Sequence, residues 1–433
     1  MAQALDTVKL DPAALTELEA SFRGELVRPD DPQYDDTRKV WNASIDRRPA
    51  LIARCTGVAD VVAAVEFAQR SGLVTAVRSG GHSFPGHGVC DGGIVIDLGL
   101  MKGIWVDPDA RTARAQAGVL LGELDRETQR FGMVVPAGIV THTGLAGLTL
   151  GGGIGHIMRK FGLTVDQLLS ADVVTADGRF IKASEKENAD LFWALRGGGG
   201  NFGIVTSFEF RLNELGPTVL AGPVAWPIED SPELLRWYRE WIKDIPDELQ
   251  TIVVHRKAPA MAPWPEEWHG KHVVMVLSCY AGSVEEGEKV LRPLKEWGKP
   301  IVDGCVPKPF LAHQAMLDPG LPWGWHYYMR AFDVMELNDE IIDISVEHSL
   351  KISSPRTSWP IFHLGGAIAK VGEDETPFNG RKSGHTFNLV GIAPGDNGEG
   401  FEEERDWARS FFDALVPHQT SAYVNFLLDE GED

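Results

Sequence analysis

The stretch Arg78-Ser79-Gly80-Gly81-His82-Ser83 decides how this sequence is interpreted. An apolar run at residues 74–77 precedes it and predicts a buried strand, so the motif falls in the turn after that strand. Two adjacent glycines let the backbone approach a ligand closely while its N–H groups point outward. Further glycine clusters occur at 92–93, 144–155 and 197–203. A chain that repeatedly brings bare backbone to one place is typical of a protein that encloses a large cofactor with phosphates.

Length, charge and cysteine content exclude several classes of protein. The 433 residues are too many for one hydrophobic core and predict two domains. The formal net charge of −21 argues against nucleic acid and anionic membranes as partners, since both need a basic surface. The four cysteines form no Cys-x-x-Cys pair, and the N-terminus lacks the features of a signal peptide. We therefore expect a cytoplasmic protein with reduced thiols.

Hydrophobic spacing predicts an α+β chain, with a lead-in at 1–40 and a first domain at 41–216. Apolar residues recur at helical spacing over 58–71, between expected strands at 51–54 and 74–77. The other elements expected here are a helix at 13–22, a strand at 94–98, a hairpin at 104–106 and 112–117, a helix at 119–131, a strand at 133–135, a hairpin at 169–175 and 180–182, a helix at 188–195 and a strand at 204–212.

The glycine clusters stop near Gly216-Pro217, where we place a domain boundary. Residues 217–395 are expected to form a second α+β domain on an antiparallel sheet, and 396–433 a C-terminal segment. A last strand at 422–427 would place Tyr423 and Asn425 on one face, because side chains alternate along a strand. The other expected elements are strands at 251–255, 273–280, 327–332 and 361–369, and helices at 285–297, 339–350 and 401–416.

The spacing Gly198-x-Gly200-x-x-Gly203 matches a dinucleotide fingerprint, but its context does not. That fingerprint follows a strand and opens a helix, whereas here a predicted helix comes first and a strand follows. A nicotinamide site of the Rossmann type is therefore disfavoured. No histidine stands with cysteine or carboxylate at metal-ligand spacing, and Gly-x-Ser-x-Gly is absent, so neither a metal site nor a serine hydrolase is expected.

The segment 136–156 combines glycines with short hydroxyl side chains and contains no lysine or arginine. Main-chain dipoles would then have to neutralise a bound pyrophosphate. Close helix–strand packing would account for any one glycine cluster, but less readily for three. A histidine beside a glycine turn is, taken alone, more often a surface residue. His82 is a candidate functional residue only because several glycine clusters accompany it.

Several ordered motifs resemble the FAD-linked oxidases of the vanillyl-alcohol oxidase superfamily, whose FAD-binding domain is of the PCMH type. The similarity covers about residues 40–215, is weaker through the second domain and returns at 422–426. The closest branch is the berberine-bridge-enzyme-like group. The motifs that carry the resemblance are Arg78 to Ser83, Gly92 to Leu98, Pro136 to Gly138, Gly151 to Gly153, Asp172 to Gly178 and Leu191 to Gly200.

The resemblance implies a two-domain FAD-binding fold with an α+β substrate domain on an antiparallel sheet. It implies one covalent link from His82 to the flavin 8α-methyl carbon. Many members carry a second link through a cysteine, but Val140 stands at that position here. The residues expected to contact FAD are Arg78, Ser79, Gly80, Gly81, His82, Ser83, Pro136, Gly138, Thr141, Thr143, Gly144, Gly147, Gly151, Gly152, Gly153, Gly155, His156, Val205, Tyr423 and Asn425.

The activity implied is oxidation of a small alcohol, sugar or amine by hydride transfer to flavin N5, with oxygen as acceptor. Thr143 takes the position that guards oxygen access in the family. Tyr423 is expected either to accept the substrate proton or to pack on the flavin. Residues 325–332 and 363–369 are expected to form the pocket wall. Two alternatives remain: a catalytically impaired flavin-binding relic, and an NADPH-dependent flavin reductase with a similar FAD domain.

Family members continue past the Tyr-x-Asn segment with a Tyr-Asp-Pro…Asn-x-Phe tail that packs near the flavin. This sequence ends at Asp433, soon after Asn425. We therefore expect a truncated chain in which Tyr423 is held loosely.

Overall fold

The structure, a computed structural model, describes residues 10–428. Its first sheet is small and mixed, with strand order β1-β2-β4-β3, and β2 and β3 run parallel to β4. Helix α3 joins β2 to β3 and ends at Gly72, whose φ of 61° is left-handed. The elements of this part are α1 (Pro12–Ser21), β1 (Glu25–Val27), α2 (Tyr34–Thr37), β2 (Leu51–Arg54), α3 (Val58–Ser71), β3 (Thr75–Arg78) and β4 (Ile94–Asp97).

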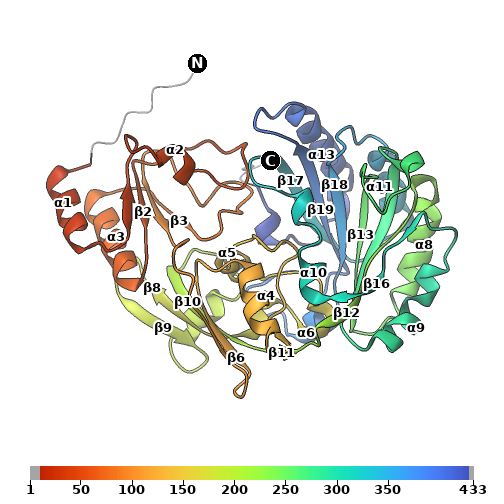
Figure 1. The fold of residues 1–433 in the computed structure, drawn as a ribbon, viewed down its shortest axis with the longest axis horizontal. Helices are drawn as coiled ribbons and strands as arrows, with labels where there is room; N and C mark the ends of the chain where they lie inside the picture. The colour runs from red at the N-terminus through yellow and green to blue at the C-terminus, as the bar shows by residue number, and fades with distance from the viewer. Residues whose placement is uncertain (1–9, 429–433) are drawn as a thin grey trace.

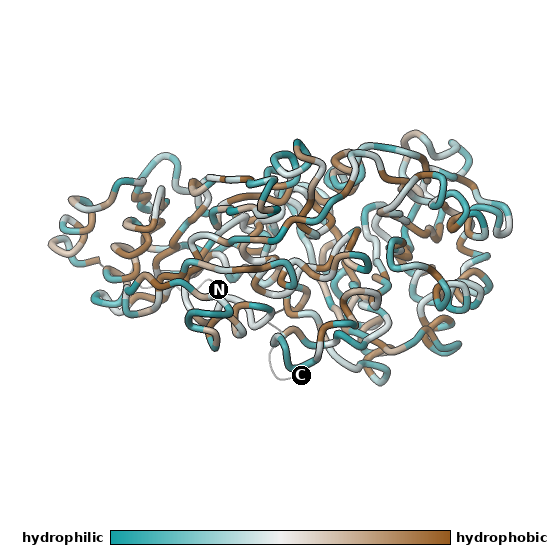
Figure 2. Tube along the Cα trace, turned by 90° about the horizontal axis from the view of Figure 1, so that it is seen from below, coloured by the Kyte–Doolittle hydropathy of each residue, from teal (hydrophilic) through white to brown (hydrophobic). Residues whose placement is uncertain are grey.

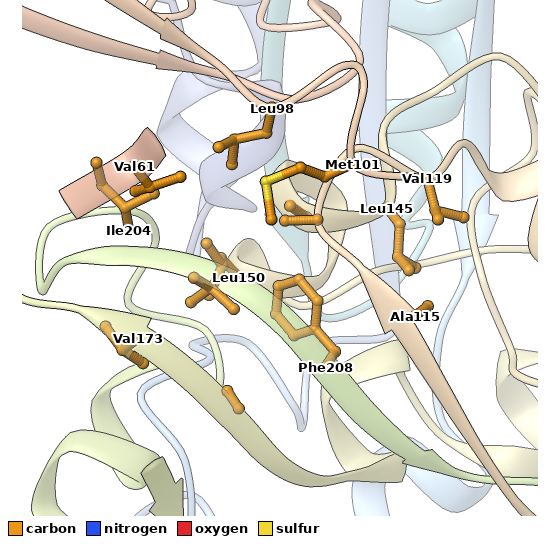
Figure 3. Close-up of a cluster of buried hydrophobic side chains, with 14 of the residues drawn as sticks. Val61, Leu98, Met101, Ala115, Val119, Leu145, Leu150, Val173, Ile204 and Phe208 are labelled. Carbon is orange, nitrogen blue, oxygen red and sulfur yellow. The ribbon is translucent and has the colours of Figure 1, made fainter. Parts of the chain in front are cut away.

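A second, antiparallel sheet follows, with strand order β5-β6-β10-β8-β9. Side chains from α3, β8, β10 and α5 meet in the hydrophobic core beside this sheet (Figure 3). Val61, Val173, Phe208 and Leu145 are fully buried there. The elements are β5 (Ile104–Asp107), β6 (Thr112–Gln116), α4 (Leu121–Gln129), β7 (Met133–Val134), α5 (Leu145–Gly151), α6 (Met158–Phe161), β8 (Leu168–Val174), β9 (Phe180–Ser184), α7 (Ala189–Ala194), β10 (Ile204–Arg211) and β11 (Asn213–Glu214).

A third, large sheet is antiparallel, with strand order β15-β12-β14-β13-β18-β19-β17, and β16 pairs with β12. The strands are β12 (Thr218–Pro227), β13 (Leu249–Lys257), β14 (His272–Tyr280), β15 (Val302–Asp303), β16 (Val306–Pro309), β17 (His326–Val334), β18 (Ser358–His363) and β19 (His385–Ala393). The helices are α8 (Ser231–Trp241), α9 (Val284–Lys295), α10 (Phe310–Gln314), α11 (Asp339–Ser349), α12 (Ala367–Lys370) and α13 (Phe401–Leu415).

The two faces of the large sheet pack against different partners. Val253 of β13 packs into a core with residues of α8, α11 and α13. Its neighbours Ile252 and Val254 pack on the opposite face with Ile154 and Met158 from the first half of the chain. Figure 1 shows α8, α9 and α11 on the outer side of this sheet and the first two sheets at the other end of the molecule. Hydrophobic and hydrophilic residues alternate along the outer helices, as expected for helices that cover one face (Figure 2).

The two halves are joined by polar contacts as well as by apolar packing. Trp41 stacks on Tyr327 with ring centroids 3.7 Å apart. The amide of Asn42 donates to the Tyr327 carbonyl at 2.9 Å and accepts from the Tyr327 N–H at 3.0 Å. The buried Arg159 of α6 donates to the carbonyls of Leu249 and Leu364 at 3.0 and 2.7 Å. These contacts fix how the first half meets the large sheet.

Most predicted elements are confirmed, and the two-domain α+β fold is observed. The strand at 51–54 and the helix at 58–71 have the predicted bounds. The strand predicted at 361–369 is wrong in its second half, because β18 ends at His363 and α12 follows. The boundary at 216–217 stays a prediction, although the large sheet begins at Thr218.

The strand predicted at 422–427 is also wrong. Val424–Phe426 forms one 3-10 turn, and only Ser421 bridges the edge strand β17, at Asp333. Beyond that bridge the chain leaves the sheet edge, so it has no ladder to join. Tyr423 and Asn425 still meet, with Asn425 Nδ2 donating to Tyr423 Oη at 2.7 Å.

Within residues 10–428 no helix is both long and apolar enough to cross a bilayer. The same residues contain no group of three or more side chains placed to hold a metal ion. All four cysteines are buried and unpaired.

We predict that Asp166→Ala destabilises the protein strongly. Arg381 is fully buried and donates two hydrogen bonds to Asp166, from Nη2 to Oδ1 at 2.7 Å and from Nη1 to Oδ2 at 3.2 Å. Removing the carboxylate leaves a buried cation without its partner, which should lower the free energy of unfolding by about 3–5 kcal/mol. Urea unfolding followed by fluorescence measures this loss. The control is Asp339→Ala, which removes the exposed partner of Arg239 and should leave the midpoint nearly unchanged. Equal midpoints for both variants would contradict the prediction.

Candidate functional site

A cavity of about 1000 Å³ lies between the first half of the chain and one face of the large sheet. Its volume is at the upper end of the range for ligand pockets, about 300–1,000 Å³. The turn after β3 and residues 138–150 form one wall, and residues 199–205 contribute a second segment. The opposite wall is the face of the sheet that carries Ile252 and Val254.

The first wall depends on contact between two backbone turns. A Cβ added at Gly80 would lie 2.5 Å from Gly144 Cα, and one added at Gly144 would lie 2.7 Å from Gly80 Cα. Because neither residue has a side chain, the two turns can touch. This contact brings His82 opposite His142, with 2.7 Å between His82 Nε2 and His142 Nδ1.

Both histidines are held in a neutral state. Burial, and to a smaller extent the neighbouring imidazole of His142, lowers the pKa of His82 well below its ordinary value. Burial also lowers the pKa of His142, against an opposing effect of Asp318. The His82 ring stacks on Trp41 with centroids 4.8 Å apart. The strand that leads to His82 is anchored by Arg78, which donates to Asp97 of β4 at 2.8 Å.

Three other glycines present bare backbone to the cavity. Gly147, Gly199 and Gly200 all border it. A Cβ at Gly147 or Gly200 would meet no atom within 4 Å, and one at Gly199 would meet only Asn201, at 3.7 Å. Open space where side chains would stand is what a bulky ligand close to the main chain requires.

The glycines at 151–155 serve a different purpose, close packing within the protein. A Cβ at Gly151 would lie 2.5 Å from the amide of Asn425, and one at Gly153 2.5 Å from Thr164 Cβ. One at Gly155 would lie 2.7 Å from the carbonyl carbon of Ala137. From the sequence, close packing could account for any one of the glycine clusters. The structure shows that it accounts for the cluster at 151–155.

The cavity brings together most of the residues predicted to contact a cofactor. Those that border it are Arg78, Ser79, Gly80, Gly81, His82, Ser83, Gly138, Thr143, Gly144, Gly147, Val205, Tyr423 and Asn425. Those predicted residues that do not border it are Pro136, Thr141, Gly151, Gly152, Gly153, Gly155 and His156.

Three of the residues away from the cavity have partners within the protein. The Pro136 carbonyl accepts from Thr164 Oγ1 at 2.7 Å, and the Thr141 N–H donates to Asp318 at 2.9 Å. His156 is fully buried beside His313, and burial lowers its pKa to about 3.

The pocket wall predicted at 325–332 and 363–369 is wrong, since neither range borders the cavity. In the first range the ring of Tyr327 stacks on Trp41. The wall is instead formed by alternate residues of several strands, because side chains alternate between the two faces of a sheet. These residues are Ile252, Val254, Arg256, Met275, Leu277, Ser358, Pro360, Phe362, Asn388 and Val390.

Tyr423 lies at the junction of the two walls and is buried. Its hydroxyl oxygen accepts hydrogen bonds from the Gly153 N–H at 2.9 Å and from Asn425 Nδ2 at 2.7 Å. Burial raises the pKa of Tyr423, while these N–H donors act in the opposite direction. The side chain is therefore a phenol at neutral pH, in a site that would partly stabilise its phenolate.

Comparison with known proteins identifies the class. The family described as "FAD binding domain" matches residues 49–184. An FAD-linked oxidoreductase of Dictyostelium discoideum is 33% identical over 94% of this chain and 86% of its own length. A xylooligosaccharide oxidase of Thermothelomyces thermophilus is 33% identical over 97% and 87%. The (R)-6-hydroxynicotine oxidase of Paenarthrobacter nicotinovorans is 35% identical over 66% and 61%.

Solved structures agree in fold. A 6-hydroxy-D-nicotine oxidase from Arthrobacter nicotinovorans superimposes with a TM-score of 0.83 at 28% identity, over 94% of this chain and 89% of that one. The BBE-like 1 variant of Physcomitrella patens gives 0.85 at 24% identity, over 96% and 92%, which supports the fold alone. The expected FAD-binding superfamily and its berberine-bridge-like fold are thus confirmed, and this chain belongs to the family of FAD-linked oxidoreductase enzymes.

Proposed function

We propose that this chain is an oxidase that binds FAD through a single covalent bond from His82. In this proposal it oxidises a C–H bond next to O–H or N–H in a small organic substrate, with oxygen as the electron acceptor. The observation that carries the proposal is a neutral His82 on the cavity wall, held by His142. Relatives named as oxidases of 6-hydroxynicotine and of xylooligosaccharides support an amine or a sugar as the substrate type.

The residues present fit such a cofactor. Gly147, Gly199 and Gly200 leave open space beside bare backbone, as phosphates and a flat ring require. When bound, FAD supplies the two-electron acceptor that side chains lack. Val140 and Thr143 also border the cavity, and the small Thr143 leaves room for oxygen to approach.

The contact between the histidines engages Nε2 of His82 and not its Nδ1. A neutral imidazole carries a proton on one nitrogen and a lone pair on the other. If His82 Nε2 donates to His142 Nδ1, the lone pair falls on His82 Nδ1. We therefore propose His82 Nδ1 as the attachment atom, with His142 as the group that holds this tautomer.

We propose that Tyr423 accepts the proton that the substrate loses. Among residues 10–428 the cavity border contains no aspartate or glutamate, so no carboxylate lies there to accept the substrate proton. The two N–H donors at Tyr423 Oη favour the phenolate once it forms. The opposing hypothesis is that the ring only packs beside the flavin.

We predict that the purified protein carries one FAD that survives acid precipitation, and that His82→Ala abolishes this link. Intact mass spectrometry should give the wild-type mass plus one FAD, with the flavin on a peptide that contains His82. The matched control is His87→Ala, because His87 also borders the cavity but is exposed. A His82→Ala protein that keeps flavin after denaturation would refute the covalent assignment.

We predict that Tyr423→Phe lowers kcat by about 10²- to 10⁴-fold, the range for loss of a general base. Only the phenolate can accept a proton, and burial raises the pKa of Tyr423 above its ordinary value of about 10. The wild-type rate should therefore rise with pH through the whole neutral and alkaline range, and the variant should lose this rise. Peroxide formation from a 6-hydroxynicotine or xylobiose substrate, assayed at several pH values, measures both effects.

The control for the tyrosine variant is Tyr327→Phe. Tyr327 Oη donates to the Pro322 carbonyl, and the residue does not border the cavity. Its replacement should leave the pH profile unchanged. If Tyr423→Phe stays within a few fold of the wild type with the same profile, Tyr423 only packs beside the flavin.

A further inference from the structure

Two arginines border the cavity on the wall formed by the large sheet, and neither makes an ion pair in the described part of the chain. Arg256 is at the end of β13, and Arg356 precedes β18. The two strands are paired, with Arg256 opposite Ser358, so both arginines stand at the same corner of the sheet. For a chain with a net charge of −21, this concentration of positive charge is unexpected.

The arginines are held by contacts that leave their charge without a counter-ion. Arg256 Nε donates to the Lys257 carbonyl at 3.1 Å. The guanidinium of Arg356 lies over the Trp325 ring at 5.3 Å. Burial and the charge of Arg356 lower the pKa of Arg256 to about 10, so it remains charged at neutral pH.

A nearby buried carboxylate, Glu404, positions this corner but does not neutralise it. Its oxygens accept from Ser353 Oγ at 2.6 Å, from the Ser354 N–H at 2.8 Å and from Thr357 Oγ1. Those bonds fix the loop that carries Arg356, and Glu404 makes no ion pair with that arginine.

The rest of this wall suits an organic molecule. Val254, Pro360 and Val390 provide an apolar surface beside the arginines. Asn388 borders the same space, and its buried Oδ1 has no hydrogen-bond partner in the protein. A buried oxygen without a partner in the protein is a position at which an N–H or O–H group of a ligand can donate a hydrogen bond.

We propose that Arg256 and Arg356 bind an oxyanion, a carboxylate or a phosphate, carried by the substrate. The guanidinium is a planar fork that matches both groups. Asn388 Oδ1 would accept from an O–H or N–H elsewhere on the same molecule. This inference rests on the proposed function, because it names the substrate class of the same cavity.

The test uses the purified holoenzyme titrated with benzoate, phenyl phosphate and the neutral benzamide. Changes in flavin absorbance report binding, and tryptophan fluorescence reports it in parallel, because Trp41 and Trp264 border the cavity. The fluorescence signal needs no flavin, so failure of the oxidase proposal leaves this measurement intact. We expect at least one anion to bind ten-fold or more tightly than benzamide.

The variants Arg256→Gln and Arg356→Gln should each weaken binding of that anion at least ten-fold and leave benzamide unchanged. Arg256→Lys should restore part of the affinity. The control is Lys308→Gln, which removes a cavity charge at the far end of the sheet. Lys308 pairs with Val219 at the start of β12, whereas Arg256 pairs with Val273, which is opposite Pro227 at the end of β12.

Several results would overturn the proposal. One is that benzamide binds the wild type as tightly as both anions. Another is that the glutamine variants lose affinity for benzamide to the same extent as for the anion, which would indicate a damaged pocket. Lower flavin content in these variants, with thermal stability unchanged, would assign the arginines to the phosphates of the cofactor instead.

Discussion

The contact between the backbones at Gly80 and Gly144 is the constraint on which the candidate site depends. The backbone of each glycine occupies the space that a side chain on the other glycine would need. A Cβ at either position would therefore force the two turns apart. Because the turns touch there, His82 and His142, two residues away on each side, also meet. The contact between His82 and His142 thus follows from the absence of two side chains rather than from a histidine motif alone.

The opposite wall is placed by a different kind of interaction. The large sheet must present Ile252 and Val254 to the cavity while Val253 faces the helices, which requires the sheet to be held against the first half in one orientation. The Asp166–Arg381 pair and the Asn42–Tyr327 bonds provide that orientation with directional contacts. Apolar packing attracts the two halves to each other, and the directional ion pair and hydrogen bonds specify their relative orientation.

The sequence predicted the parts of the molecule whose signals are local. Helix 58–71 has a strong helical period and a terminating glycine, and both bounds were correct. The sheet wall was missed because Val253 and Val254 are equally apolar, and nothing local distinguishes the face that meets helices from the face that meets a cavity. The segment at 422–427 alternates like a strand, but a strand needs a neighbour to pair with. The partner of His82 was missed because it lies 60 residues away.

One physical effect, desolvation, leaves neutral histidines on one wall of the cavity and a cationic arginine on the other. Desolvation lowers the pKa of every basic group, and it acts on the histidines and on Arg256 alike. An imidazole titrates near neutrality, so a modest loss of solvation makes it neutral and leaves a lone pair available. A guanidinium begins so far above neutrality that it stays a cation even with a pKa of about 10. Burial therefore leaves a neutral imidazole on the wall with the glycine turns and preserves a positive charge on the wall formed by the sheet.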